Sequence, residues 1–192
     1  MGRPKTISDD DVLRVARKTF QAKGHTASTR AVADAAGISE AVLYQRFGSK
    51  DVLFFRAMHA TGPDVERLLG PIDPPDDARI FLRRVVVRVG KYFAEVIPLA
   101  LHVMTHPSFD RKMLGPPGGP AELKAGLAAR IEVLVRNRKI VSPSPSTTAR
   151  LLISLAHDWA LGLALRHIPN SRNARDLEEM VDVIWAGLKP GK

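Results

Sequence analysis

A stretch of fifteen residues, GISEAVLYQRFGSKD at positions 37–51, places the strongest constraint on what this chain can fold into. Gly37 and Gly48 stand where two helices are expected to end, because glycine adopts the left-handed backbone conformation without steric cost. Ser39 and Ser49 stand where two helices are expected to begin, because a serine hydroxyl can accept a hydrogen bond from a first-turn amide. The pattern therefore predicts a very short helix, residues 40–47, held between two breaks.

The residues before this stretch supply the other half of a helix-turn-helix. Residues 9–23 and 29–36 are expected to form two helices, because their apolar residues recur at helical spacing. Leu43 and Phe47 are four positions apart, so they face one core and leave the rest of the short helix exposed. Two short helices joined by a tight glycine turn are typical of a helix-turn-helix, whose second helix enters a major groove about 12 Å wide.

Composition limits the class of protein. The chain has 192 residues, of which 45% are hydrophobic, so it can bury a full core and is expected to be globular. It has no cysteine, which excludes disulfides, thiolate metal sites and cysteine nucleophiles, and which suits a reducing cytosol. We find no signal peptide and no apolar run long enough to span a bilayer, so we expect a cytoplasmic protein with no membrane partner.

The charge balance favours a polyanionic partner. The net charge is +9, from 29 Lys and Arg against 20 Asp and Glu. The first 50 residues carry nine basic and five acidic residues, a net charge of +4, and the remainder carries +5. Nucleic acid is the commonest polyanionic partner of a basic protein. Because both parts are basic, charge alone does not say which part makes the contact.

The whole chain is predicted to be all-α, with about nine helices, because no segment alternates apolar and polar residues for long enough to form a strand. We expect two domains, a three-helix helix-turn-helix domain over residues 1–50 and a helical domain over residues 51–192. Pro98 is expected to end the fifth helix and to separate it from a short sixth helix. The expected helices beyond residue 50 cover 51–61, 76–96, about 98–106, 121–138 and two C-terminal segments, with breaks at 62–75, 107–120 and 142–145.

At the N-terminus the sequence resembles a known family. The segments VLRVARKTFQAKG and STRAVADAAGISEAVLYQRFGSKDVL, within residues 10–58, are similar to the N-terminal domain of the TetR family of transcriptional regulators. The resemblance implies an all-α homodimer that binds a pseudo-palindromic operator in double-stranded DNA. It also implies a variable C-terminal domain with a pocket for a small organic effector.

The resemblance and the exposed face of the short helix together give the candidate DNA contacts. Tyr44 and Lys50 match family residues that reach the DNA backbone. Arg30 matches a position that can reach guanine, and Gln45 and Arg46 lie on the exposed face with side chains suited to adenine and to guanine or phosphate. The full set of predicted DNA-binding residues is Thr29, Arg30, Ser39, Glu40, Ala41, Tyr44, Gln45, Arg46 and Lys50.

The sequence departs from the family pattern directly after Ser39. Glu40, Ala41 and Val42 stand where the family commonly has a basic residue, a glycine and a threonine that binds phosphate. Val42 has no hydroxyl to donate, and Glu40 repels phosphate unless it accepts a hydrogen bond from a cytosine amino group. The operator contacts of this protein are therefore expected to differ from the family pattern.

The C-terminal helices predict association and a pocket. The first of the two C-terminal helices has almost no polar face, and the second repeats apolar residues at a spacing of three to four. Both are expected to pair with the same helices of a second copy, through Leu152, Leu155, Trp159, Leu163, Leu177, Val181, Ile184 and Leu188. Burial within one chain is the alternative. A tentative effector pocket comprises Phe93, His102, Met104, His106, Phe109, Asp158 and Trp159. A stripe of charged residues on the fifth helix is expected to be solvated, although it could bind an anion: Arg84, Arg88, Lys91 and Glu95.

No catalytic set is identifiable. His102 and His106 have the spacing of two metal ligands on a helix, but no third ligand is identifiable, so neither a metal site nor a cofactor is predicted. We therefore expect a ligand-responsive repressor and not an enzyme. Two alternatives stay open, an effector-independent architectural or adaptor DNA-binding protein and an enzyme that merely carries this domain.

Overall fold

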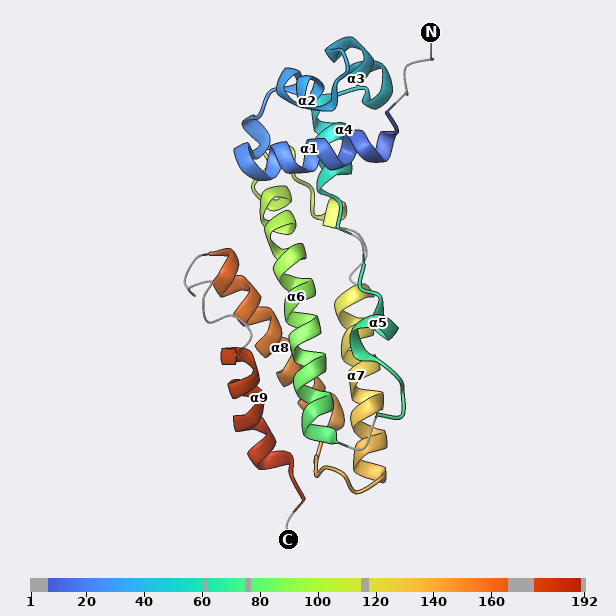
Figure 1. Ribbon diagram of the computed structural model, residues 1–192, viewed down its shortest axis with the longest axis vertical. Coiled ribbons are helices and arrows are strands. Elements are labelled where there is room, and N and C mark those ends of the chain that lie inside the picture. Colours follow the sequence, from blue (N-terminus) through green and yellow to red (C-terminus); the bar gives the residue numbers. More distant parts are fainter. Residues whose placement is uncertain (1–6, 61, 75–76, 115–117, 166–174, 191–192) are drawn as a thin grey trace. The chain divides into compact units, whose positions relative to one another are not determined.

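A computed structural model describes residues 7–60, 62–74, 77–114, 118–165 and 175–190 (Figure 1). All regular structure in these ranges is helical, which confirms the predicted all-α class. The chain divides into two compact units, Met1–Thr61 with Pro98–Gly115, and Gly62–Ile97 with Pro116–Lys192. The α-helices of the described ranges are α1 (Asp9–Lys23), α2 (Thr29–Ala36), α3 (Glu40–Phe47), α4 (Lys50–Met58), α5 (Val65–Leu69), α6 (Ala78–Met104), α7 (Gly118–Arg136), α8 (Pro145–Ala164) and α9 (Arg175–Leu188).

Serine caps define the helix starts of the first unit. Ser8, Ser28, Ser39 and Ser49 have extended backbones, and each hydroxyl accepts a hydrogen bond from the amide three residues further on. Gly37 ends α2 in the left-handed conformation, with φ 68°. The helices predicted over residues 9–23, 29–36 and 40–47 are confirmed.

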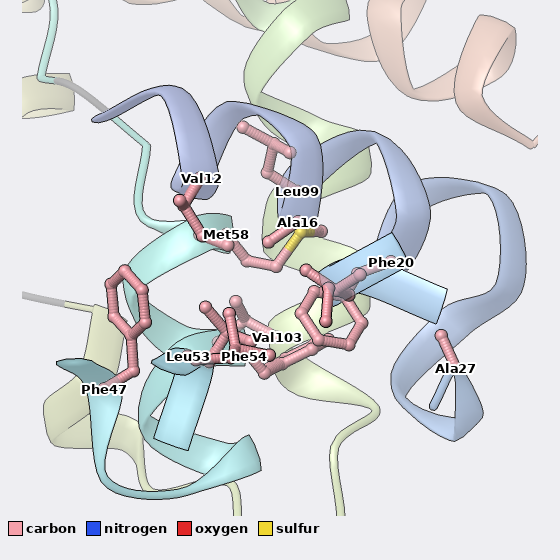
Figure 2. Packing of buried hydrophobic residues seen from close by; sticks show 14 residues of the cluster. Val12, Ala16, Phe20, Ala27, Phe47, Leu53, Phe54, Met58, Leu99 and Val103 are labelled. Carbon is pink, nitrogen blue, oxygen red and sulfur yellow. The ribbon is translucent and has the colours of Figure 1, made fainter. Parts of the chain in front are cut away.

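The core of the first unit combines α1–α4 with a segment that is distant in the sequence. Figure 2 shows Val12, Phe20 and Phe54 of this core together with Leu99 and Val103, which come from the last turns of α6. The rings of Phe20 and Phe54 meet edge to face, with their centroids 5.1 Å apart. The unit therefore extends beyond the boundary at residue 50 that the sequence suggested, because α4 and the segment 98–115 are needed to cover the apolar faces of α1–α3.

Residues 98–115 are called the closing segment here, because they complete the core of the first unit. His106 lies in the middle of this segment. Its side chain is 5% exposed, and its ring packs against Phe54 and Phe55 with centroid distances of 4.6 and 4.7 Å. The imidazole Nδ1 accepts a hydrogen bond from the Ser108 amide at 3.1 Å, so this nitrogen carries no proton. The Ser108 hydroxyl donates to Asp51 at 2.7 Å. These contacts join the start of α4 to the turn after α6.

An arginine of α1 holds the other end of α4. The α4 helix ends at His59 without a glycine cap, so its last carbonyls need other donors. Arg17 supplies them, because its Nε donates to the Ala57 carbonyl at 2.6 Å and its Nη2 to the His59 carbonyl at 2.8 Å. The helix that follows the helix-turn-helix is thus tied to α1 by charge-assisted hydrogen bonds.

Two expectations about the chain between residues 62 and 104 were wrong. Pro98 does not separate two helices, because it lies inside the continuous helix α6. A proline within a helix costs roughly 3 kcal/mol, and the burial of Phe93, Ile97, Leu99 and Val103 along α6 offsets this cost. The predicted break at 62–75 also contains a short helix, α5, which Asp64 caps by accepting from the Arg67 amide.

The second unit is a helical bundle of the first part of α6 with α5, α7, α8 and α9. Helices α7 and α8 pack against each other, as do α8 and α9 and α5 and α7 (Figure 1). Gly90 of α6 lets Trp159 and Leu177 approach closely, since a Cβ at this position would lie 2.9 Å from Leu177. Asp182 of α9 bonds to both Arg79 and Arg83 of α6, which holds the pKa of this carboxyl well below its usual range.

The environment of His106 makes the stability of the protein depend on pH. Burial is the main cause that lowers the pKa of His106 below its ordinary 6.5; His25 and Lys50 lower it further, and Asp51 opposes them. The folded state therefore binds fewer protons than the unfolded state between this lowered pKa and 6.5. The stabilisation is complete above pH 6.5 and decreases as the pH falls through the lowered pKa.

We therefore expect the urea midpoint of unfolding to fall between about pH 7 and pH 5, and to fall less steeply in a His106→Gln variant. The variant differs from the natural sequence only in lacking the titrating imidazole of His106. The other ionisable groups of the chain therefore contribute equally to the two pH profiles. Parallel pH profiles for the two proteins would contradict a buried, neutral His106.

Candidate DNA-binding interface

Helices α2 and α3 are joined by a small hydrogen-bonded cluster. Thr29, the first residue of α2, is 6% exposed, and its hydroxyl donates to the carboxylate of Glu40. The same hydroxyl lies 3.2 Å from the phenol oxygen of Tyr44. Glu40 and Tyr44 are four residues apart on α3, so they present one face to Thr29. The cluster fixes the start of α2 against the first turns of α3.

The opposite faces of α3 differ sharply in burial. Leu43 and Phe47 are 1% and 4% exposed and belong to the core of the first unit, as the sequence predicted. Val42 and Tyr44 are 37% and 43% exposed, and Gln45 is also exposed. A helix with two buried anchors and an open outer face is suited to insertion into a groove.

Six of the nine predicted DNA-binding residues have exposed or half-buried side chains. Arg30, Ser39, Ala41, Tyr44 and Gln45 are exposed, and Lys50 is half-buried at the start of α4. The Ser39 hydroxyl already accepts from the Val42 amide as a helix cap. Neither Arg30 nor Lys50 forms an ion pair within the described ranges, so both cations are available to an anionic partner.

The other three predicted residues have hydrogen-bond partners within the chain, as Tyr44 also does through the Thr29 hydroxyl. Thr29 and Glu40 form a hydrogen bond with each other, so the Glu40 carboxylate has a partner within the chain. Arg46 turns back to the start of α1, where its Nη2 donates to the Ile7 carbonyl at 2.8 Å and pairs with Asp9 at 2.7 Å. These side chains position the helices. The sequence did not reveal these pairings, because they join residues that are 11 to 39 positions apart.

The residues of the predicted effector pocket are divided between the two units. His106 and Phe109 pack on the core of the first unit, and Met104 is 53% exposed. Phe93 and Trp159 are buried in the second unit, Asp158 is exposed and His102 is half-buried. The indole nitrogen of Trp159 is buried and has no hydrogen-bond partner.

A different concavity is present in the second unit, with a volume of about 290 Å³. Its walls come from the end of α5, the residues after it and the first half of α6. The sequence pattern does not predict this concavity, because it indicates a break over residues 62–75, although the basic stripe on α6 points to one wall. The lining residues are Leu69, Gly70, Pro71, Asp73, Phe81, Arg84, Val85 and Arg88.

The predicted dimer residues are largely buried within one chain. Leu152, Trp159, Leu177, Val181 and Leu188 are at most 7% exposed. Leu155, Leu163 and Ile184 are half-buried. The apolar residues that α8 and α9 leave exposed are instead their neighbours, Leu151, Leu165, Met180 and Val183.

Within the residues that the structure describes, neither a cluster of metal ligands nor a membrane-spanning helix is present. No group of three or more His, Cys, Asp or Glu side chains there is arranged to hold a metal ion. None of the helices in those ranges is both long and apolar enough to cross a membrane.

The fold and the exposed helix α3 define the class of the N-terminal unit, a helix-turn-helix domain. The sequence profile of the bacterial regulatory proteins of the tetR family matches residues 12–57, the part that forms α1–α4. The N-terminal unit is therefore a TetR-family helix-turn-helix domain, as the sequence resemblance indicated. None of the curated proteins has a sequence that matches this chain.

Solved structures show the same fold over nearly the whole chain. PfmR, a TetR-family transcriptional regulator from Thermus thermophilus, is 24% identical, with a TM-score of 0.62 over 97% of this chain and 100% of its own. A proposed TetR-family regulator from Mesorhizobium loti is 17% identical, with a TM-score of 0.71 over 95% and 96% of the two chains. The flavonoid-responsive regulator FrrA is 22% identical, with a TM-score of 0.56 over 95% and 97%. The chain thus has the fold of TetR-family transcriptional regulators.

The cluster between α2 and α3 predicts the effect of removing one hydroxyl. Thr29→Val keeps the shape of the side chain but leaves Glu40 without its donor, so we expect the free energy of unfolding to fall by about 1–2 kcal/mol. Gln45→Ala, on the exposed face of the same helix-turn-helix, should change it by less than about 0.5 kcal/mol. Urea denaturation measures both. Equal effects of the two substitutions would show that the cluster does not hold the helices together.

Proposed function

We propose that this protein is a dimeric transcriptional repressor that a small organic effector releases from a pseudo-palindromic operator. The observation that carries the proposal is the exposed face of α3, flanked by Arg30 and Lys50, on a helix-turn-helix whose inner face is fully buried. Phosphate contacts from the two cations would orient the domain, and Tyr44 and Gln45 would meet the backbone and the base edges.

Glu40 fits this docking because its carboxylate is already satisfied. It accepts from the Thr29 hydroxyl, so the negative charge lies against the start of α2, where backbone amides carry partial positive charge. The repulsion between Glu40 and phosphate is thereby reduced. The base specificity of α3 then depends on its exposed residues, chiefly Ala41, Val42 and Gln45.

The second copy would pack on the exposed apolar faces of α8 and α9. Val183 is 77% exposed, Leu151 55%, Leu165 48% and Met180 40%. Half-buried Leu155 and Ile184 extend these faces between the fully buried core positions. Large apolar side chains exposed on two helices that pack against each other are typical of a surface that another protein covers. A two-fold dimer would place two α3 helices in successive major grooves, about 34–36 Å apart.

An effector is supported by the second unit, which holds a concavity of about 290 Å³ outside the helix-turn-helix. The similar structure of the flavonoid-responsive regulator FrrA is consistent with a response to a small organic molecule. An effector that binds the DNA-free state more tightly than the DNA-bound state would release the operator. A cytoplasmic location and the absence of catalysis are parts of the same proposal.

The docking face predicts which variants lose DNA binding. Tyr44→Ala and Lys50→Ala should each weaken binding to the DNA that flanks the protein's own gene, without a change in the far-ultraviolet circular dichroism. Lys50→Ala should also reduce the log–log salt dependence of binding by about one unit, because one phosphate contact is lost. Lys189→Ala, an exposed lysine of the second unit, serves as the charge-matched control. Unchanged DNA affinity of both test variants at matched salt would contradict the assignment of this face as the DNA-binding surface.

The apolar faces predict the effect of one charge. Val183→Glu should convert the dimer to a folded monomer, because a carboxylate buried without a partner costs several kcal/mol in the dimer and nothing at an exposed site in the monomer. Ala125→Glu on the exposed side of α7 adds the same charge elsewhere and should leave the dimer intact. Analytical ultracentrifugation distinguishes the two states. A stable dimer of the Val183 variant would place the interface on another surface.

A further inference from the structure

We propose that the concavity beside α5 binds a small amphipathic carboxylate, that is, one aromatic ring or short acyl chain that bears a single carboxylate group. Its volume of about 290 Å³ lies at the lower end of the range for small-molecule pockets, roughly 300–1,000 Å³. Leu69, Pro71, Phe81 and Val85 supply apolar walls. In the proposed regulator this would be the effector site, and only this role depends on the proposed function.

Two arginines give the site its preference for an anion. Arg84 and Arg88 are one helical turn apart on α6, both line the concavity and both are exposed. Neither forms a hydrogen bond or ion pair within the described part of the chain. Like charges at this spacing repel each other, and an anion between them would relieve that repulsion. The guanidinium fork also matches the two oxygens of a carboxylate.

A third arginine holds the wall that the end of α5 and Gly70 provide. Arg130 of α7 is 2% exposed, and its Nε donates to the Gly70 carbonyl at 2.8 Å. Its Nη1 donates to the Gly126 carbonyl at 3.0 Å, and its Nη2 pairs with Glu66 of α5 at 2.9 Å. Gly70 itself has a φ of 75°, and the Arg88 Nη1 is 3.8 Å from the position that a Cβ on Gly70 would occupy. The buried Arg130 thus fixes the wall from inside and leaves Arg88 at its open side.

The same contacts determine the charge that a ligand should carry. Glu66 is engaged by Arg130, so it does not neutralise the two arginines of α6. Asp73 is the acidic residue in the lining. The two arginines and this aspartate together carry a net charge of +1. A monoanion balances this net charge, whereas a phosphate monoester carries about −1.5 to −2. The apolar walls favour a ring or acyl chain over a sugar.

The test is isothermal titration calorimetry on the full-length protein without DNA, with benzoate and octanoate as probes. We expect saturable binding of at least one probe, at least about tenfold tighter than that of its neutral amide, benzamide or octanamide. Phenyl phosphate should bind less tightly than benzoate. Arg84→Ala and Arg88→Ala should each weaken carboxylate binding by about tenfold or more. Lys91→Ala, which removes a cation of the same stripe outside the lining, should have no effect.

Four results would overturn the site: no saturable binding of either carboxylate, equal affinity for the neutral amides, tighter binding of phenyl phosphate, or binding that survives both arginine substitutions. All three substituted positions, Arg84, Arg88 and Lys91, are exposed on α6, so circular dichroism should show unchanged folding in each variant. A gel shift with and without the bound probe is read separately. DNA binding that does not respond to a saturating probe would contradict the effector role in the proposed function and would leave the carboxylate site standing.

Discussion

The burial of Phe54 against the closing segment is the interaction on which the DNA-binding unit depends. Phe54 is completely buried and contacts Phe20 of α1, Phe55 of its own helix and His106 from the turn after α6. Leu99, Val103 and His106 complete this core from a segment about 45 residues away in the sequence.

This arrangement explains how the angle of α3 is set. Leu43 and Phe47 anchor its inner face in the shared core, and Thr29 holds its first turns through Glu40 and Tyr44. At its last turn, Arg46 bonds to the start of α1. Each end of α3 is thus fixed by polar contacts and its middle by burial, so that the exposed face is free for recognition. In the proposed complex, the polar residues nearest the DNA major groove would position α3 as well as contact the DNA.

How much the sequence could predict depended on how local each signal was. The caps at Ser39 and Ser49 and the left-handed turn at Gly37 are local, and the helices of the helix-turn-helix were predicted with nearly correct bounds. The continuity of α6 through Pro98 was not predictable, because tertiary burial outweighs the local preference of proline. The five-residue helix α5 and the partners of Arg46 and Arg130 were missed for the same reason, since distant residues decide them.

Native-state hydrogen exchange on the full-length protein tests most directly whether the recognition helix depends on the closing segment. The account predicts that amides of α1, of α4 and of residues 99–106 exchange with one common opening free energy, and that His106→Gln lowers this value for all three together. Rapid exchange of residues 99–106 while α1 and α4 stay fully protected would contradict it, because the helix-turn-helix would then be folded without its closing segment.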